Sequence, residues 1–136
     1  MLRMQVEYDT SRLALVTAED EGVLGSHIFG DDVTRVPYIL YYNNNIATEN
    51  FTVNGTVATL MFRVLDDAEL GDAYVRVAAL GRYDAMNADG DEVSFATVDG
   101  NIEVSPIIYG DVDGDGSVTA RDAMFLSRYI AGYDVD

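Results

Sequence analysis

The chain has 136 residues and no cysteine, and it carries 24 acidic against 8 basic residues, for a formal net charge of −16. The lack of cysteine excludes disulfides and thiolate metal sites, and the negative charge disfavours nucleic acid and anionic membrane surfaces as partners. No apolar run approaches the roughly 20 residues that cross a bilayer. Residues 1–8 do not have the pattern of a signal peptide. An acidic surface of this kind suits cation binding.

Residues 1–104 have the pattern of a series of short strands. Apolar and polar residues alternate across residues 2–8, as in a half-buried strand. Further apolar runs separated by turn residues predict strands at 13–16, 37–42, 57–64, 74–80, 93–98 and 102–104. A hairpin turn is expected at 99–101, and only 66–70 suggests a short helical turn. The expected fold is mainly β, an antiparallel β-sandwich or jelly roll.

The residue composition changes at Ser105-Pro106, after which glycine and aspartate dominate as far as Gly116. We therefore expect two domains, residues 1–105 and residues 106–136. The second is too small to build its own hydrophobic core, so it needs a metal, a partner or the first domain to hold it.

Residues 111–122 match the pattern of a calcium-binding loop. Carboxylates occupy loop positions 1, 3, 5 and 12, and Gly116 stands at position 6, where the backbone must turn sharply. Position 12 is aspartate where glutamate is usual. Oxygen ligands exclude soft metals, and a flexible loop suits Ca²⁺ better than Mg²⁺. The predicted Ca²⁺ ligands are Asp111, Asp113, Asp115, the carbonyl of Ser117, Thr119 and Asp122.

A single helix is expected directly after this loop. Thr119 and Asp122 are spaced as a capping box, and Gly132 is placed to end the helix near Ala131. Val118, at loop position 8, is expected to pair with a neighbouring strand and point into a core. Residues 107–110 are a poor helix, so the entry helix of a standard EF-hand is missing.

Gly110–Gly132 resembles a dockerin repeat over its whole length, including the aspartate at position 12 and the missing entry helix. In that family two repeats form a module that docks onto a cohesin domain, and here one repeat is present. The resemblance implies partner contacts from Ala120, Arg121, Ser127 and Arg128. Many members have Ser-Thr where this chain has Ala120-Arg121, which leaves the class of partner open.

The preceding region resembles a cohesin domain, a nine-stranded jelly roll. The resemblance rests on residues 4–15, Val57–Val64 and Phe95–Val104, in that order. It implies that the first strand of the fold would precede Met1, which would leave an unpaired sheet edge.

Together these resemblances imply a non-catalytic scaffold or adaptor protein in a calcium-dependent cohesin–dockerin assembly. Its partners would be dockerin- and cohesin-bearing proteins, and its setting an extracellular or cell-surface complex that degrades polysaccharide. Tyr41 and Tyr42 would lie on the partner-binding surface of the cohesin-like domain.

Two alternatives remain open. The first is a carbohydrate-binding or adhesive sandwich with a dockerin tether, in which the cluster of Tyr38, Tyr41 and Tyr42 stacks on sugars. The second is a structural surface protein stabilised by calcium. Asn87–Asp91 mimics the start of a calcium loop but lacks the glycine at position 6, and His27 has no partner motif for catalysis, so we expect neither to act.

Overall fold

The computed structural model describes residues 1–25, 28–30, 32–44 and 46–132; His27 lies outside them. The chain divides into two compact units, Met1–Val104 and Ser105–Asp136, which we call unit 1 and unit 2. Each unit is described by itself.

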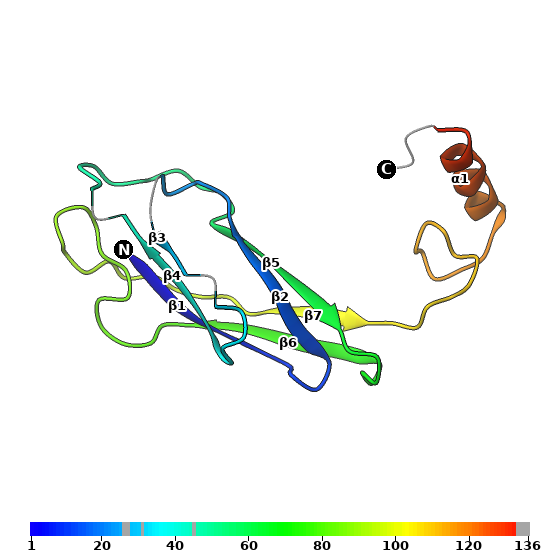
Figure 1. Cartoon of the computed structure of the whole chain (residues 1–136), viewed down its shortest axis with the longest axis horizontal. Coiled ribbons are helices and arrows are strands. Elements are labelled where there is room, and N and C mark those ends of the chain that lie inside the picture. Colours follow the sequence, from blue (N-terminus) through cyan, green and yellow to red (C-terminus); the bar gives the residue numbers. More distant parts are fainter. Residues whose placement is uncertain (26–27, 31, 45, 133–136) are drawn as a thin grey trace. The chain divides into compact units, whose positions relative to one another are not determined.

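Unit 1 consists of antiparallel strands in two sheets (Figure 1). The larger sheet has the order β3-β4-β1-β6-β7, and the smaller pairs β2 with β5. The prediction of a mainly β, antiparallel fold is confirmed. The strands are β1 (Leu2–Tyr8), β2 (Leu13–Asp20), β3 (Ile28–Phe29), β4 (Tyr38–Asn43), β5 (Ala58–Val64), β6 (Gly71–Ala78) and β7 (Gly100–Val104).

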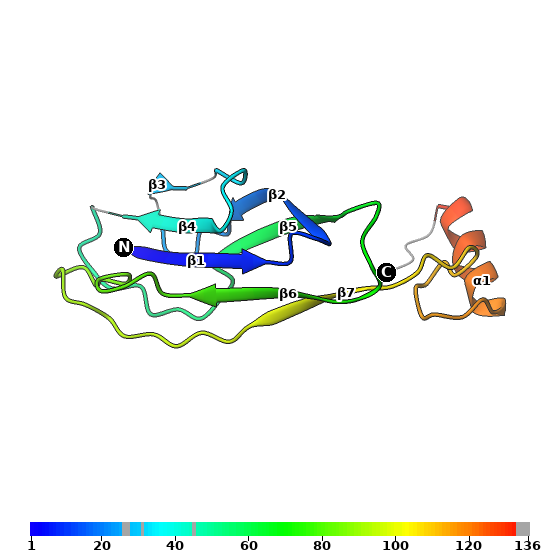
Figure 2. The ribbon, with the colours of Figure 1, turned by 90° about the horizontal axis from the view of Figure 1, so that it is seen from below.

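The core of unit 1 lies between the two sheets, with β2 and β5 covering one face of the larger sheet (Figures 1 and 2). The ring of Tyr8 on β1 meets the ring of Phe62 on β5 edge to face, with centroids 5.1 Å apart, a favoured aromatic geometry. Alternate residues of each strand point inward, as the pleat requires. The buried members of the cluster are Val6, Tyr8, Leu13, Leu15, Tyr38, Leu40, Ala73 and Val104.

Three local predictions were wrong. Residues 93–98 do not form a strand, and residues 94–98 make no backbone hydrogen bond to any described residue. Because Gly100 already belongs to β7, residues 99–101 are not a hairpin turn. Residues 66–70 form a turn without a helix. A segment in which apolar and polar residues alternate forms a strand only where a neighbouring strand is available for backbone hydrogen bonds.

Unit 2 contains one helix, α1 (Ala120–Ile130). Thr119 is its N-cap and forms the predicted capping box with Asp122, while Gly132 follows the C-cap Ala131 at φ 81°. Both predictions are confirmed. Among the described residues of unit 2 no apolar residue is buried, so this unit has no apolar core there. No helix in the described part of the chain is long and apolar enough to cross a membrane.

Candidate metal centre and docking surface

Three aspartates converge in the loop that precedes α1. Asp111, Asp113 and Asp115 each place one carboxylate oxygen within 4.8 Å of the others. Gly114 and Gly116 have φ of 74° and 88°, a backbone conformation that side chains other than glycine adopt with strain. These two glycines let the chain turn tightly enough to bring the carboxylates together.

Backbone N–H groups of the loop hold these carboxylates in place. Asp111 Oδ1 accepts hydrogen bonds from the N–H groups of Gly114 (2.9 Å) and Asp115 (3.1 Å), and its Oδ2 accepts from Gly116 (2.8 Å). The N–H of Ser117 donates to Asp115 Oδ1 over 2.9 Å. The loop therefore folds around the side chain at its first position.

Asp113 has an anionic oxygen that lacks a hydrogen bond. Its Oδ2 is buried and accepts no hydrogen bond from any described residue, although Arg121 Nε lies 2.9 Å away as an ion pair. Desolvation raises the pKa of Asp113, and the charges of Asp115 and Asp122 add to that rise. An oxygen-lined site with excess negative charge fits a hard divalent cation such as Ca²⁺.

Asp122 does not join the group of three aspartates. Its buried carboxylate links the two ends of the loop instead: Oδ1 accepts from the N–H groups of Val112 (2.8 Å) and Asp113 (3.3 Å). Its Oδ2 accepts from the N–H of Thr119 (2.5 Å) and from Thr119 Oγ1 (3.3 Å). These bonds, above all that from the Thr119 N–H, lower the pKa of Asp122.

The other two predicted ligands lie in the same loop. Ser117 is exposed and follows Gly116 directly. Thr119 Oγ1 accepts from the N–H of Arg121 over 3.2 Å, as the cap of α1. Val118 is 59% exposed and lies in no strand, so the prediction that it pairs with a neighbouring strand is wrong for the described chain. Its side chain packs beside Gly110, where an added Cβ would lie 3.3 Å from Val118 Cγ1.

The four predicted docking residues are all exposed and lie on α1. Ala120 and Ser127 are seven residues apart, as are Arg121 and Arg128, so each pair lies on the same side of the helix and the pairs adjoin. The guanidinium of Arg121 also lies over the ring of Phe125, with Cζ 5.4 Å from its centroid. The result is one continuous exposed surface with two cationic groups and a hydroxyl.

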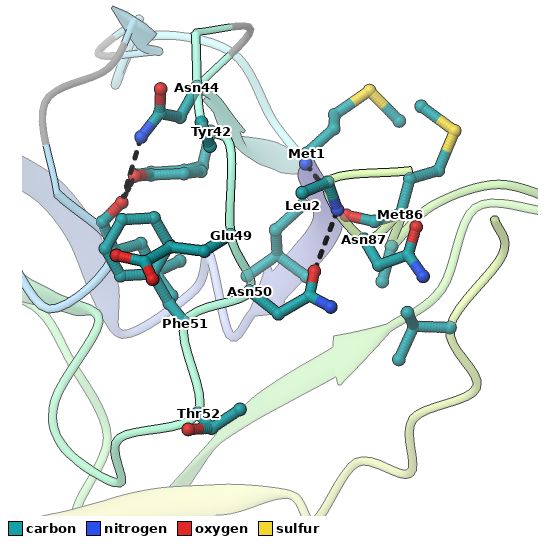
Figure 3. Close-up of a pocket in the computed structure, with 15 residues that line it drawn as sticks. Met1, Leu2, Tyr42, Asn44, Glu49, Asn50, Phe51, Thr52, Met86 and Asn87 are labelled. Carbon is teal, nitrogen blue, oxygen red and sulfur yellow. Dashed lines mark hydrogen bonds between the residues drawn. The ribbon is translucent and has the colours of Figure 1, made fainter. Parts of the chain in front are cut away.

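Tyr41 and Tyr42 do not share a surface. They are neighbours on β4, so their side chains lie on opposite faces of the sheet. Tyr42 is 3% exposed, and its hydroxyl donates to the carbonyl of Leu24 (Figure 3). The expectation that Tyr41 and Tyr42 both line a partner surface is therefore corrected for Tyr42, which is buried, while Tyr41 is half-buried on the other face. A sugar-stacking platform of Tyr38, Tyr41 and Tyr42 is corrected likewise, because Tyr38 is also buried.

The look-alike loop at residues 87–91, which resembles the start of a calcium loop, is held by hydrogen bonds between its own residues. Asn87 Oδ1 accepts from the N–H groups of Asp89 (3.0 Å) and Asp91 (2.9 Å). Among the described residues, no acidic group of three comparable to that of Asp111, Asp113 and Asp115 forms here.

Comparison with known proteins gives one family match, in the C-terminal part of the chain. Residues 98–136 match the Dockerin type I domain. No curated protein and no solved structure matches the chain. Type I dockerin domains bind Ca²⁺, which confirms calcium as the predicted cofactor. They are non-catalytic modules that bind cohesin domains, and they occur in secreted cellulosome components. The match identifies no cohesin domain.

Proposed function

We propose that unit 2 is a calcium-organised docking element that binds a cohesin domain. The observation that carries this proposal is the convergence of Asp111, Asp113 and Asp115 within the segment that matches the Dockerin type I domain. The bound cation would be held by these three carboxylates together with Ser117, Thr119 and Asp122. It would supply positive charge where the loop concentrates negative charge.

The docking surface would be the exposed side of α1 that bears Ala120, Arg121, Ser127 and Arg128. Asp122 ties the loop to the first turn of this helix, so metal binding and helix position are mechanically linked. The two guanidinium groups favour a partner surface with carboxylates or exposed carbonyl oxygens. The structural boundary between Val104 and Ser105 fits a division into domains at residues 105 and 106.

For unit 1 we propose a cohesin-like sandwich, which would make the whole chain an adaptor in an extracellular polysaccharide-degrading complex. Its two antiparallel sheets with a shared core support this proposal. In that role unit 1 would receive a dockerin from another protein while unit 2 occupies a further cohesin. An adaptor of this kind needs no catalytic group of its own.

The test is binding to a panel of cohesin domains, measured by calorimetry with calcium and then with excess chelator. We expect saturable binding to at least one cohesin that disappears in chelator and in Asp111→Ala. The matched control is Asp89→Ala, which removes an exposed aspartate from the look-alike loop and is expected to bind as the unmodified chain does. Binding that survives chelation, or no binding to any cohesin in calcium, would refute the docking role.

A further inference from the structure

Unit 1 contains a cavity that the docking function does not use. It has a volume of about 440 Å³, within the range of about 300–1,000 Å³ typical of small-molecule sites. Its walls come from segments far apart in the sequence: the start of β1, the residues after β4, and residues 85–88 with Val93 (Figure 3). Asn50 joins two of these segments, because its Oδ1 accepts from the N–H of Ala88 over 2.8 Å.

Part of the lining of the cavity is apolar and includes an aromatic ring. The apolar side chains are those of Leu2, Leu24, Met86 and Val93, together with the ring of Phe51. The ring of Phe51 packs against Gly25, where an added Cβ would lie 2.8 Å from Phe51 Cζ. This contact limits how far the ring can move toward Gly25, so the cavity keeps an aromatic surface against which a flat ligand face can pack.

The lining also includes polar side chains, and one of them has a buried oxygen that accepts no hydrogen bond from a described residue. Asn44 Nδ2 donates to the carbonyl of Leu24 over 3.4 Å, while its Oδ1 is buried and accepts from no described residue. A buried acceptor without a donor is destabilising until a donor reaches it. Asn50 Oδ1 accepts from the N–H of Ala88, and the lining also includes the carboxylate of Glu49.

The lining also excludes whole classes of ligand. Among the described residues no arginine side chain lines the cavity, and its charged groups are the carboxylate of Glu49 and the α-amino group of Met1, which donates to the carbonyl of Met86 over 3.1 Å. With a formal net charge of −16 on the chain, an anionic ligand is repelled. An apolar wall with an aromatic ring, beside amide and carboxylate groups, is instead suited to a ring with one C–H face and several hydroxyls.

We propose that this cavity binds a neutral sugar residue, with its C–H face against Phe51 and its hydroxyl groups on Asn44, Glu49 and Asn50. This site shares only Tyr42 with the sugar-stacking cluster of Tyr38, Tyr41 and Tyr42, and it does not depend on calcium or on the docking surface of α1. Unit 1 would then hold a polysaccharide directly, whether or not unit 2 docks.

The test is titration of the full chain with cellotriose, xylotriose and mannotriose, followed by saturation-transfer NMR and calorimetry. We expect one of them to bind saturably at millimolar concentration, with or without chelator. Phe51→Ala and Glu49→Ala should each weaken that binding by about tenfold. The control Phe95→Ala removes a partly exposed aromatic ring outside the cavity and should leave the affinity unchanged.

Three results would overturn the sugar site. One is that no trisaccharide binds at millimolar concentration. Another is that both cavity variants, shown to be folded by unchanged melting curves, bind as the unmodified chain does. The third is that hexylamine binds at this cavity in preference to all three sugars, which would identify Glu49 as a receptor for cations. Loss of sugar binding in chelator would move the site to unit 2 and would equally refute the proposal.

Discussion

Arg121 Nε lies 2.9 Å from Asp113 Oδ2, so one residue of the proposed docking surface is in contact with the proposed metal centre. Burial and the neighbouring aspartates raise the pKa of Asp113, and the guanidinium opposes part of that rise because it favours the charged carboxylate. It therefore competes with a cation for the same oxygen. We therefore expect Arg121 to favour binding of the docking partner and to oppose binding of the metal.

We expect Arg121→Ala to bind Ca²⁺ more tightly, by roughly two- to fivefold, because the exposed guanidinium no longer opposes the cation. The same variant should bind its cohesin partner more weakly. Calorimetric titration with Ca²⁺ and then with the partner measures both effects. The control is Arg128→Ala, which removes the other cation of the docking surface without touching the loop and should leave calcium affinity unchanged. Weaker calcium binding in Arg121→Ala would contradict the competition.

Calcium should stabilise α1 by mass action, since the folded loop binds the ion and the unfolded loop does not. At a free concentration one hundredfold above the dissociation constant the gain is about 2.7 kcal/mol. Circular dichroism of helix melting at increasing calcium concentration checks this. Asp111→Ala should abolish the shift because Asp111 is both a member of the aspartate group and the acceptor for three loop N–H groups. Asp89→Ala should retain it.

Thr119→Ala should destabilise α1 by about 1 kcal/mol, because it removes the side-chain acceptor at the N-cap. The loss should be visible as lower helix content in chelator, where no metal supports the loop. Thr97→Ala, at an exposed position outside any strand, serves as the control. Equal helix content in the two variants would show that the capping box contributes nothing.

Unit 1 should lose stability in acid through Asp84. This side chain is buried, and the N–H of Gly81 and the guanidinium of Arg3 hold its pKa below the usual value of 3.8. A lowered folded-state pKa means that its contribution is complete above pH 3.8 and is lost as the pH falls through the folded-state value.

Asp84→Asn should therefore melt at a lower temperature than the unmodified chain at pH 7, and the difference should shrink in more acidic buffer. Melting temperature measured from pH 7 to pH 2 checks this. Asp67→Asn, a change at an exposed aspartate, should follow the unmodified chain throughout. A constant difference across the whole range would exclude Asp84 as the source.

The features that could be predicted from the sequence are those set by neighbouring residues. Thr119 and Asp122 are three residues apart, so the capping box follows from spacing alone, and the alternation in β1 depends only on its own pattern. The strand expected at 93–98 needed a distant partner that the fold does not supply. The cavity was missed for the same reason, since Asn50 and Ala88 meet only after folding.

The proposed calcium ligands were predicted only in part from the sequence. Loop spacing indicated Asp111, Asp113 and Asp115, and the structure brings them together. The same spacing named Asp122 as an equivalent ligand, but its oxygens already accept four hydrogen bonds from Val112, Asp113 and Thr119. Backbone hydrogen bonds do not by themselves distinguish Asp122 from Asp111, because Asp111 also accepts three of them; Asp122 differs in lying outside the group of three carboxylates.

The carboxylate of Asp122, in the first turn of α1, accepts hydrogen bonds from the beginning of the loop and so holds the loop against the helix. Any replacement at this position is expected to alter both the proposed metal centre and the start of the proposed docking surface. A substitution of Asp122 cannot change the metal centre and the docking surface independently. We therefore expect a change of preferred partner to arise from substitutions at Ala120, Ser127 or Arg128, with Asp122 retained.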